Sequence, residues 1–561
     1  MQFDPDTILP MSSKPFFHFE LGDYQSAFAD ALKIADEVNL AARLWAGDHT
    51  LWGDSPNEIS NRLGWLNIAE SLSSEISELQ SFTEEIKAGG ISQVLLLGMG
   101  GSSLAPEVFS KIFGAKSGFP ELSVLDSTDP GAVKSAQGSH KPSSTLYIIS
   151  TKSGGTVETL SFFKTFYNQA LAELGKDIAG QHFVAITDPG SKLADLAKQH
   201  NFRRTFTNDP NIGGRYSALS YFGLVPAALL GVDLKRLLER ARLMAINCGA
   251  DVLNSENPGV RLGLALSSLG KAGRDKATFV APPEIDSFGD WAEQLIAEST
   301  GKEGKGILPV VNERLGEADL YGDDRVFINL SLSGEQNSQE IGELQAAGHP
   351  VIEIKWQDKS DLGGQLFLWE FATAVTGYGL GINPFDQPNV ESAKVQGRRF
   401  VEAYAESGLL PPVDSQALSS SSINSFLKTN KAGDYIALQA YIKPNDEAWE
   451  VLQKFRLKLQ KKYRLASTLG YGPRFLHSTG QLHKGDGGNG LFIQFVSESS
   501  EDLAVPAEVG SSGSEISYDV LKQAQALGDS QALRDAGRRV LTFMVEDDFV
   551  IHLEKIIGEF A

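Results

Sequence analysis

The segment WAEQLIAESTGKEGKG, residues 291–306, contains a carboxylate that could act as a general base. Glu298 lies near the end of a stretch with the apolar spacing of an amphipathic helix, and Gln294 stands one helical turn earlier on the same face. A carboxyl group in a partly dry pocket has a raised pKa and can accept a proton near neutral pH. The same spacing is also typical of a solvated glutamate at a helix end.

A second segment, IISTKSGGTVET at residues 148–159, has the groups that bind a phosphate monoester. Its glycine pair allows close approach of the backbone, and hydroxyl groups surround a lysine. A helix cap would explain one or two of these hydroxyls but not four. The segment lacks the GKS/T of a P-loop. The predicted phosphate ligands are Thr151, Lys152, Ser153, Thr156 and Thr159.

A glycine-rich turn, VLLLGMGGSSLAP at residues 94–106, leads from an apolar run into an expected helix. Its bare N–H groups could bind an anion at the helix N-terminus, although a purely structural turn has the same pattern. Ser103 stands where a dinucleotide-binding fingerprint has its third glycine or alanine, which argues against a nicotinamide site.

Three further segments carry charged or titratable side chains beside turns. In NDPNIGGRYSALS, residues 208–220, Arg215 follows a glycine pair and could project into a cleft or remain a solvated arginine. In GINPFDQPNVESAK, residues 381–394, Gln387 and Lys394 are seven residues apart and would share one helix face. In RFLHSTGQLHKGDGGNG, residues 474–490, two histidines frame a glycine-rich loop, where an imidazole could transfer protons near neutral pH or be merely structural.

The elements expected to position these segments follow an α/β rhythm. Short apolar runs alternate with helical patterns from residue 91 onward, which predicts parallel sheets covered by helices on both faces, with ligands at the carboxyl ends of the strands. The expected strands are 94–97, 122–125, 146–149, 183–186, 278–281, 307–311, 326–332 and 351–354. We divide the chain into a helical N-terminal cap (1–90), two α/β domains (91–240 and 241–404) and a C-terminal region (405–561) that contains a strand, a helix and the histidine loop.

Composition narrows the functional classes. The 561 residues are 42% hydrophobic and 22% charged, as in an ordinary globular protein. A net charge of -21 argues against nucleic acids and anionic membranes as partners, and no apolar run reaches the roughly 20 residues that cross a bilayer. The single cysteine, Cys248, excludes an internal disulfide, and the nine histidines lack metal-ligand spacing. We therefore expect a cytoplasmic protein without a metal.

Five of these segments, in this order, resemble the motifs of the glucose-6-phosphate isomerase family. They are GMGGS, STKSGGTVET, GGRYS, AESTGK and FDQPNVESAK, spread over residues 94–394. The resemblance implies two sugar-isomerase (SIS-type) domains, each a doubly wound parallel sheet, with the active site between them at the interface of a homodimer. It implies an aldose–ketose isomerase that interconverts glucose 6-phosphate and fructose 6-phosphate, in glycolysis and gluconeogenesis, without a cofactor.

The resemblance also implies a role for each matching residue. Glu298 would be the base, Arg215 the cation that stabilises the enediolate, and Lys394 a helper in ring opening. These roles agree with the chemistry, because a base must reach two adjacent carbons and the developing oxyanion needs a cation that does not titrate. The positions that match substrate and phosphate contacts are Gly101, Ser102, Thr151, Lys152, Ser153, Thr156, Thr159, Gln294 and Gln387.

The histidine that would open the sugar ring does not stand where the family has it. Between the base and lysine motifs the chain has only His349, in an apolar stretch typical of the start of a strand. The segment LHKGDGGN, around His483, resembles the family's histidine loop although it follows Lys394. We therefore predict that His483 opens the ring, with His477 and His349 as the open alternatives.

The whole arrangement is closest to the isomerase half of fused transaldolase and glucose-6-phosphate isomerase proteins. The residues before the first expected strand are too few for a transaldolase barrel, so we expect isomerase activity only. Two alternative functions stay open: an isomerase that also accepts mannose 6-phosphate, and a non-catalytic sugar-phosphate sensor. Retention of the base, the arginine and the lysine together argues against the sensor.

Overall fold

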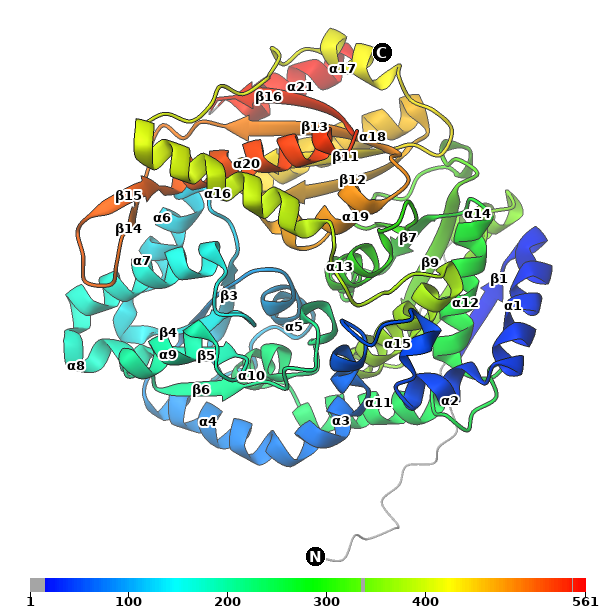
Figure 1. The fold of residues 1–561 in the computed structure, drawn as a ribbon, viewed down its shortest axis with the longest axis horizontal. Helices are drawn as coiled ribbons and strands as arrows, with labels where there is room; N and C mark the ends of the chain where they lie inside the picture. Colours follow the sequence, from blue (N-terminus) through cyan, green and yellow to red (C-terminus); the bar gives the residue numbers. More distant parts are fainter. Residues whose placement is uncertain (1–15, 334–338, 547, 561) are drawn as a thin grey trace, which may run out of the picture.

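The first of three main sheets is wholly parallel and carries the glycine-rich and hydroxyl-rich segments. The computed structural model describes residues 16–333, 339–546 and 548–560. The strand order is β3-β2-β4-β5-β6 (Figure 1). The strands are β2 (Gln93–Gly98), β3 (Glu121–Leu125), β4 (Thr145–Ser150), β5 (Phe183–Thr187) and β6 (Arg204–Thr207). Four of them, β2 to β5, coincide with expected strands. The central strands β2, β4 and β5 are almost wholly buried, and a buried parallel strand leaves an uninterrupted apolar run.

Helices cover both faces of this sheet, as the doubly wound prediction requires. In β2, Val94 and Leu96 belong to one apolar core, and Leu95 and Leu97 to another, because successive side chains point to opposite faces. The first core includes α4 (Ile76–Ala88), α5 (Leu104–Phe113) and α10 (Tyr221–Leu229). The second includes α6 (Pro130–Ser139), α7 (Val157–Leu174) and α9 (Lys192–Gln199), beside the short α8 (Lys176–Ala179).

The second sheet has the order β1-β10-β9-β7-β8, and all but one of its pairs are parallel. Its strands are β1 (Phe16–Glu20), β7 (Lys276–Val280), β8 (Leu308–Val310), β9 (Arg325–Leu332) and β10 (Val351–Trp356). Its helices are α11 (Leu234–Asn247), α12 (Pro258–Lys271), α13 (Phe288–Thr300), α14 (Gln339–Ala346) and α15 (Leu362–Leu380).

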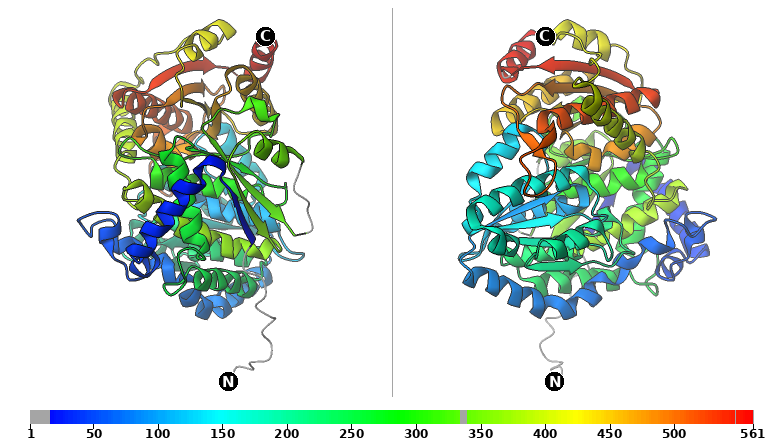
Figure 2. Two further views of the ribbon diagram at one scale, coloured as in Figure 1. Left: turned by 90° about the vertical axis from the view of Figure 1, so that its right-hand side faces the viewer. Right: turned by 60° about the vertical axis from the view of Figure 1, so that its left-hand side comes forward.

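One strand of this sheet comes from the N-terminal segment that we expected to be helical. β1 pairs antiparallel with β10 and covers its edge, as the left view of Figure 2 shows. The rest of that segment is helical as expected, with α1 (Gln25–Glu37), α2 (Leu40–Trp45), α3 (Ile68–Ser71) and α4. A five-residue aromatic run gives little periodicity, and its pairing with residues more than 300 positions away is a tertiary event.

The C-terminal region forms a third α/β layer across the other two (Figure 1). Its parallel sheet has the order β12-β11-β13-β16. The strands are β11 (Tyr435–Tyr441), β12 (Ala466–Tyr471), β13 (Gly490–Ser497) and β16 (Arg539–Val545), with a hairpin of β14 (Ala504–Pro506) and β15 (Ser514–Ser517). The helices are α17 (Ser420–Leu427), α18 (Asp446–Tyr463), α19 (Gly480–Gly485), α20 (Tyr518–Asp535) and α21 (Phe549–Glu559), and α16 (Val390–Ser407) packs along α20.

The molecule is thus a mixed α/β protein built on parallel sheets. The glycine-rich and hydroxyl-rich segments follow β2 and β4, and Arg215 lies after β6, which agrees with ligand binding at the carboxyl ends of parallel strands. Glu298 lies at the end of α13, and Gln387 and Lys394 follow α15. Throughout the described ranges, no helix has both the length and the apolar character needed to cross a membrane. The domain boundaries at residues 90, 240 and 404 remain our proposed division.

Candidate active site

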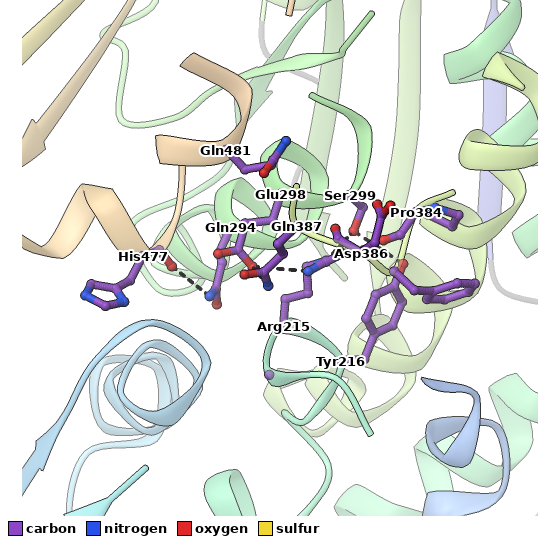
Figure 3. Close-up of polar contacts among 12 residues, drawn as sticks. Arg215, Tyr216, Gln294, Glu298, Ser299, Pro384, Asp386, Gln387, His477 and Gln481 are labelled. Atoms are coloured by element: carbon purple, nitrogen blue, oxygen red, sulfur yellow. Dashed lines mark hydrogen bonds and ion pairs between the residues drawn. The ribbon is translucent and has the colours of Figure 1, made fainter. Parts of the chain in front are cut away.

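Glu298 and Arg215 are buried side chains that lie next to each other (Figure 3). Oε2 of Glu298 lies 3.5 Å from Nη1 of Arg215, and the two residues are only 4% and 1% exposed. Glu298 is at the C-terminal end of α13, and Arg215 belongs to a 3-10 turn, η10 (Gly214–Tyr216), 83 residues earlier in the chain. The fold therefore brings together the predicted base and the predicted cation.

The guanidinium of Arg215 is held in one orientation. Its Nε donates to the hydroxyl of Ser299 at 2.7 Å, and its Nη2 donates to the backbone carbonyls of Pro384 at 2.5 Å and Asp386 at 3.2 Å. These contacts come from α13 and from the turn between α15 and α16. A cation fixed in this way can stabilise a developing negative charge without reorganisation.

Burial governs the protonation of Glu298. Removal from water raises the pKa of its carboxyl group above the ordinary glutamate value, and the positive charge of Arg215 partly opposes that rise. Gln387, in the turn before α16, donates from Nε2 to Oε2 of Glu298 at 3.3 Å. The carboxylate is thus suited to accept a proton at a pH closer to neutrality than a solvated glutamate would.

The histidine beside this cluster is His477, which ends the 3-10 turn η13 (Arg474–His477). Its backbone carbonyl accepts a hydrogen bond from Nε2 of Gln294 at 2.8 Å, as Figure 3 shows, and its ring Nε2 lies 3.0 Å from Oε1 of Glu158. Gln525, on α20, donates to the same Glu158 oxygen at 2.7 Å. Segments far apart in sequence therefore meet around His477 and Glu158.

Glu158 is a functional candidate that the sequence analysis missed. Burial alone would raise the pKa of its carboxyl group, but His477 and the neighbouring hydrogen bonds outweigh burial and lower that pKa. An ionised Glu158 would hold the proton of His477 on Nε2. The signal was present in the sequence, since the only carboxylate of residues 148–159 stands between two of the predicted hydroxyl ligands.

His483, the histidine that we predicted to open the sugar ring, lies in the core of the C-terminal layer. His483 is buried in α19, where its ring centroid is 5.0 Å from that of Phe492 and its Nδ1 is 3.3 Å from the amide of Gln439. Burial lowers the pKa of this imidazole well below its ordinary value. The third candidate, His349, packs against Phe327 in the second sheet. Five residues lie between His477 and His483, and the turn into α19 directs the latter to the core.

The hydroxyl-rich segment brings two of its predicted phosphate ligands together. The hydroxyls of Thr151 and Thr156 are 2.9 Å apart, and Oγ1 of Thr159 is buried with no hydrogen-bond partner among the described residues. Ser153 is exposed. Lys152 instead forms an ion pair with Asp188 and donates to the carbonyl of Pro210 at 3.1 Å. Its charge is therefore shared with the loop after β5.

The glycine loop after β2 lies directly against the loop of Arg215. A Cβ atom on Gly101 would fall 2.1 Å from the carbonyl oxygen of Gly214, and one on Gly100, which has a φ of +55°, would fall 2.8 Å from the carbonyl of His477. Only glycine permits both approaches. Ser102 is buried, and its carbonyl accepts a hydrogen bond from Ser150 at 2.9 Å.

Two lysines complete the charge distribution. Lys394 is exposed on α16, and its positive charge partly opposes the burial-driven rise in the pKa of Glu298 and adds to the lowering of the pKa of Glu158. Lys302, which the sequence analysis did not select, is buried and donates from Nζ to the carbonyl and the Oδ1 of Asp386 at 2.7 and 2.8 Å. Burial, together with the charge of Arg215, lowers the pKa of Lys302 to about 8.

Comparison with known proteins places these residues in a family context. A model of the phosphoglucose isomerase family matches residues 65–303, which include Arg215 and Glu298. A glucose-6-phosphate isomerase of Cyanothece sp. is 30% identical over 450 residues, covering 70% of this chain and 81% of that protein. A probable glucose-6-phosphate isomerase of Methanococcus maripaludis is 28% identical over 378 residues, covering 60% of this chain and 84% of that protein.

Solved structures share the fold. A hypothetical protein from Thermus thermophilus superposes with a TM-score of 0.59 at 24% identity, covering 68% of this chain and 99% of that one. A glucose-6-phosphate isomerase from Chlamydia trachomatis gives a TM-score of 0.52 at 21% identity, covering 66% and 78%. The 30% identical relative, supported by the family match, shows that the chain belongs to the glucose-6-phosphate isomerase family.

Proposed function

We propose that this protein interconverts glucose 6-phosphate and fructose 6-phosphate by moving a proton between C2 and C1. The observation that carries the proposal is the buried carboxylate of Glu298, 3.5 Å from the fixed guanidinium of Arg215. A base and a permanent cation held side by side away from water are what enediolate chemistry next to a carbonyl requires.

The reaction relocates hydrogen and leaves the overall oxidation state unchanged. Glu298 takes the proton from C2 of the open-chain aldose, and the electrons of that C–H bond form the C1–C2 double bond of an enediolate. Arg215 stabilises the negative charge on oxygen. Glu298 then returns the proton to C1, while the proton of the C2 hydroxyl passes to the C1 oxygen, so that C2 becomes the carbonyl carbon. One carboxylate suffices because the two carbons are bonded neighbours.

We assign phosphate binding to the hydroxyls of residues 151–159 and to the glycine loop. The adjacent hydroxyls of Thr151 and Thr156 and the hydroxyl of Thr159, unpartnered among the described residues, support this assignment. Gly101 and Ser102 lie in the 3-10 turn η7 (Gly100–Ser102), just before α5. Ser153 is the exposed hydroxyl of the set. Lys152, paired with Asp188, would contribute its charge at longer range. Gln294 and Gln387 are our candidates for sugar hydroxyl contacts, since both amides lie beside the base.

For ring opening, we replace His483 by His477. With its Nε2 proton directed to Glu158, His477 has Nδ1 left to exchange a proton with the ring oxygen or the anomeric hydroxyl. Lys394 remains our proposed helper because its charge acts on both carboxylates. The cytoplasmic location and the homodimer stay predictions.

The test is a coupled assay on fructose 6-phosphate with the wild-type protein, Glu298→Gln and the matched control Glu303→Gln, which alters an exposed glutamate five residues away. We expect turnover by the wild type and the control, and a loss of about 10²- to 10⁴-fold in Glu298→Gln with substrate binding retained. An inert wild type that still binds sugar phosphate would instead identify a sensor. Mannose 6-phosphate in the same assay decides whether the specificity at C2 is broader.

A further inference from the structure

The loop that follows β3 joins the first sheet to the C-terminal layer. Residues 126–129 are all buried, and three of them contact side chains of that layer. Arg474 donates to Oδ2 of Asp126 at 2.9 Å. The hydroxyl of Thr128 donates to Gln525 at 2.8 Å, and Lys522 donates to Asp129 at 3.0 Å. The loop of residues 126–129 thus contacts both η13 and α20.

Arg474 has a second carboxylate partner on the same side. Its Nη2 also donates to Glu107, in the first turn of α5, directly after the glycine loop of the site. One guanidinium therefore bridges the loop after β3 and the helix after β2. The planar fork of an arginine can hold two carboxylates at fixed angles, which a lysine cannot do.

The turn that carries Arg474 also carries His477, three residues later. η13 lies so close to the glycine loop that no side chain fits at Gly100. The turn also borders a cavity of about 660 Å³, whose lining includes Arg474, Phe475 and Ser478. Because the cavity leaves one side of η13 without packed neighbours, the ion pairs of Arg474 with Asp126 and Glu107 contribute to holding η13 in position.

From this geometry we propose that Arg474 is a positioning residue of the isomerase site, which holds η13 so that the ring of His477 faces Glu158. The inference rests on the proposed function and deepens it. Arg474 itself does not contact the substrate. Arg474 acts by fixing the position of the His477 imidazole, so it affects only ring opening, the step that needs that imidazole.

The test compares Arg474→Met with Lys134→Met. Lys134 forms an exposed ion pair, at 3.2 Å, with Glu501 of the C-terminal layer, so its variant removes a link between the same parts of the chain without touching η13. Two substrates are assayed: fructose 6-phosphate, and 5-deoxyfructose 6-phosphate, which lacks the hydroxyl that closes the ring. We expect Arg474→Met to lower turnover of the first by about 10- to 100-fold and of the second by less than about three-fold. Lys134→Met should change neither, and Arg474→Lys should fall between.

A double-mutant cycle with His477→Ala sharpens this test. If Arg474 acts through His477, adding Arg474→Met to His477→Ala causes no further loss with fructose 6-phosphate. Equal losses on the two substrates, or additive losses in the cycle, would overturn the proposal. Should Arg474→Met not fold, Asp126→Asn takes its place in the same cycle.

A readout independent of activity separates this inference from the proposed function. In protein labelled with ¹⁵N-histidine, the Nε2 resonance of His477, assigned by its absence in His477→Ala, reports the hydrogen bond to Glu158. We expect Arg474→Met to move it toward the position of a free imidazole, and Lys134→Met to leave it unchanged. An unmoved resonance in Arg474→Met rejects the positioning role. An inactive wild type with the expected shift rejects the proposed function alone.

Discussion

Glu298 and Arg215 face each other at 3.5 Å, and separate neighbours hold each of them in place. Gln387 donates to the carboxylate, whereas Ser299 and two backbone carbonyls accept from the guanidinium. Burial raises the pKa of the Glu298 carboxyl group, and the charge of Arg215 partly opposes that rise. The arginine therefore influences the pH at which Glu298 is ionised. This relationship yields the first prediction.

Arg215→Met removes the cation but keeps much of the apolar stem. We expect kcat to fall by about 10²- to 10³-fold, with substrate affinity changed much less, because the charge acts mainly on the enediolate. Arg236→Met, at an exposed ion pair, is the matched control and should behave as wild type. Equal losses in kcat and affinity would contradict a transition-state role.

The same variant makes a prediction about pH. Glu298 must be ionised to act as a base, and burial raises its pKa, so the acidic limb of kcat/KM should lie above the ordinary glutamate value of 4.5. Loss of the guanidinium removes a group that favours the carboxylate, and the limb should move to still higher pH in Arg215→Met. A pH–rate profile measures this. A shift toward lower pH would show that the two side chains do not interact as described.

The pKa of Lys302 predicts where the alkaline limb of the pH–rate profile lies. Burial, aided by Arg215, lowers its pKa to about 8, and the protonated amine holds Asp386, whose carbonyl in turn accepts from Arg215. Above about pH 8 the amine loses its proton and that support weakens, so kcat/KM should decline. Lys302→Arg should move the decline to higher pH because a guanidinium does not titrate in this range. An identical profile in both proteins would exclude Lys302 as the titrating group.

His477 and His483 make a natural pair of variants. We expect His477→Ala to lower turnover of fructose 6-phosphate by about 10²-fold or more, with little loss on 5-deoxyfructose 6-phosphate, because only the ring-closed sugar needs the imidazole. His483→Ala leaves a cavity in the C-terminal core and should lower the melting temperature without changing the ratio of the two activities. The reverse outcome would restore the role first predicted for His483.

Gly101 tests the contact between the two glycine-containing loops. A methyl group in Gly101→Ala would meet the carbonyl of Gly214 at 2.1 Å, and the resulting overpacking should cost about 1–3 kcal/mol of unfolding free energy and displace Arg215. Gly138→Ala is the control. Position 138 lies in α6 with no atom within 4 Å of the added carbon, so alanine should stabilise the protein by up to about 1 kcal/mol. Chemical denaturation of both variants gives the comparison.

The amino-acid sequence by itself determined the alternation of strands and helices in the first two sheets and the residue types of the site. Apolar runs such as 94–97 and 146–149 become central strands because burial on both faces of a parallel sheet requires apolar side chains at consecutive positions. The local sequence around Arg215 and around Glu298 was enough to select these two residues, and the fold brings them together.

Only the tertiary structure decided which histidine lies beside a buried carboxylate and where Lys152 directs its charge. His477 meets Glu158 across 319 positions, and Lys152 meets Asp188 across 36, so neither contact leaves a trace in local spacing. β1 and most of the C-terminal sheet were missed for the same reason. Periodicity reports which face of an element is apolar, whereas the partner that covers that face is chosen by packing over the whole chain.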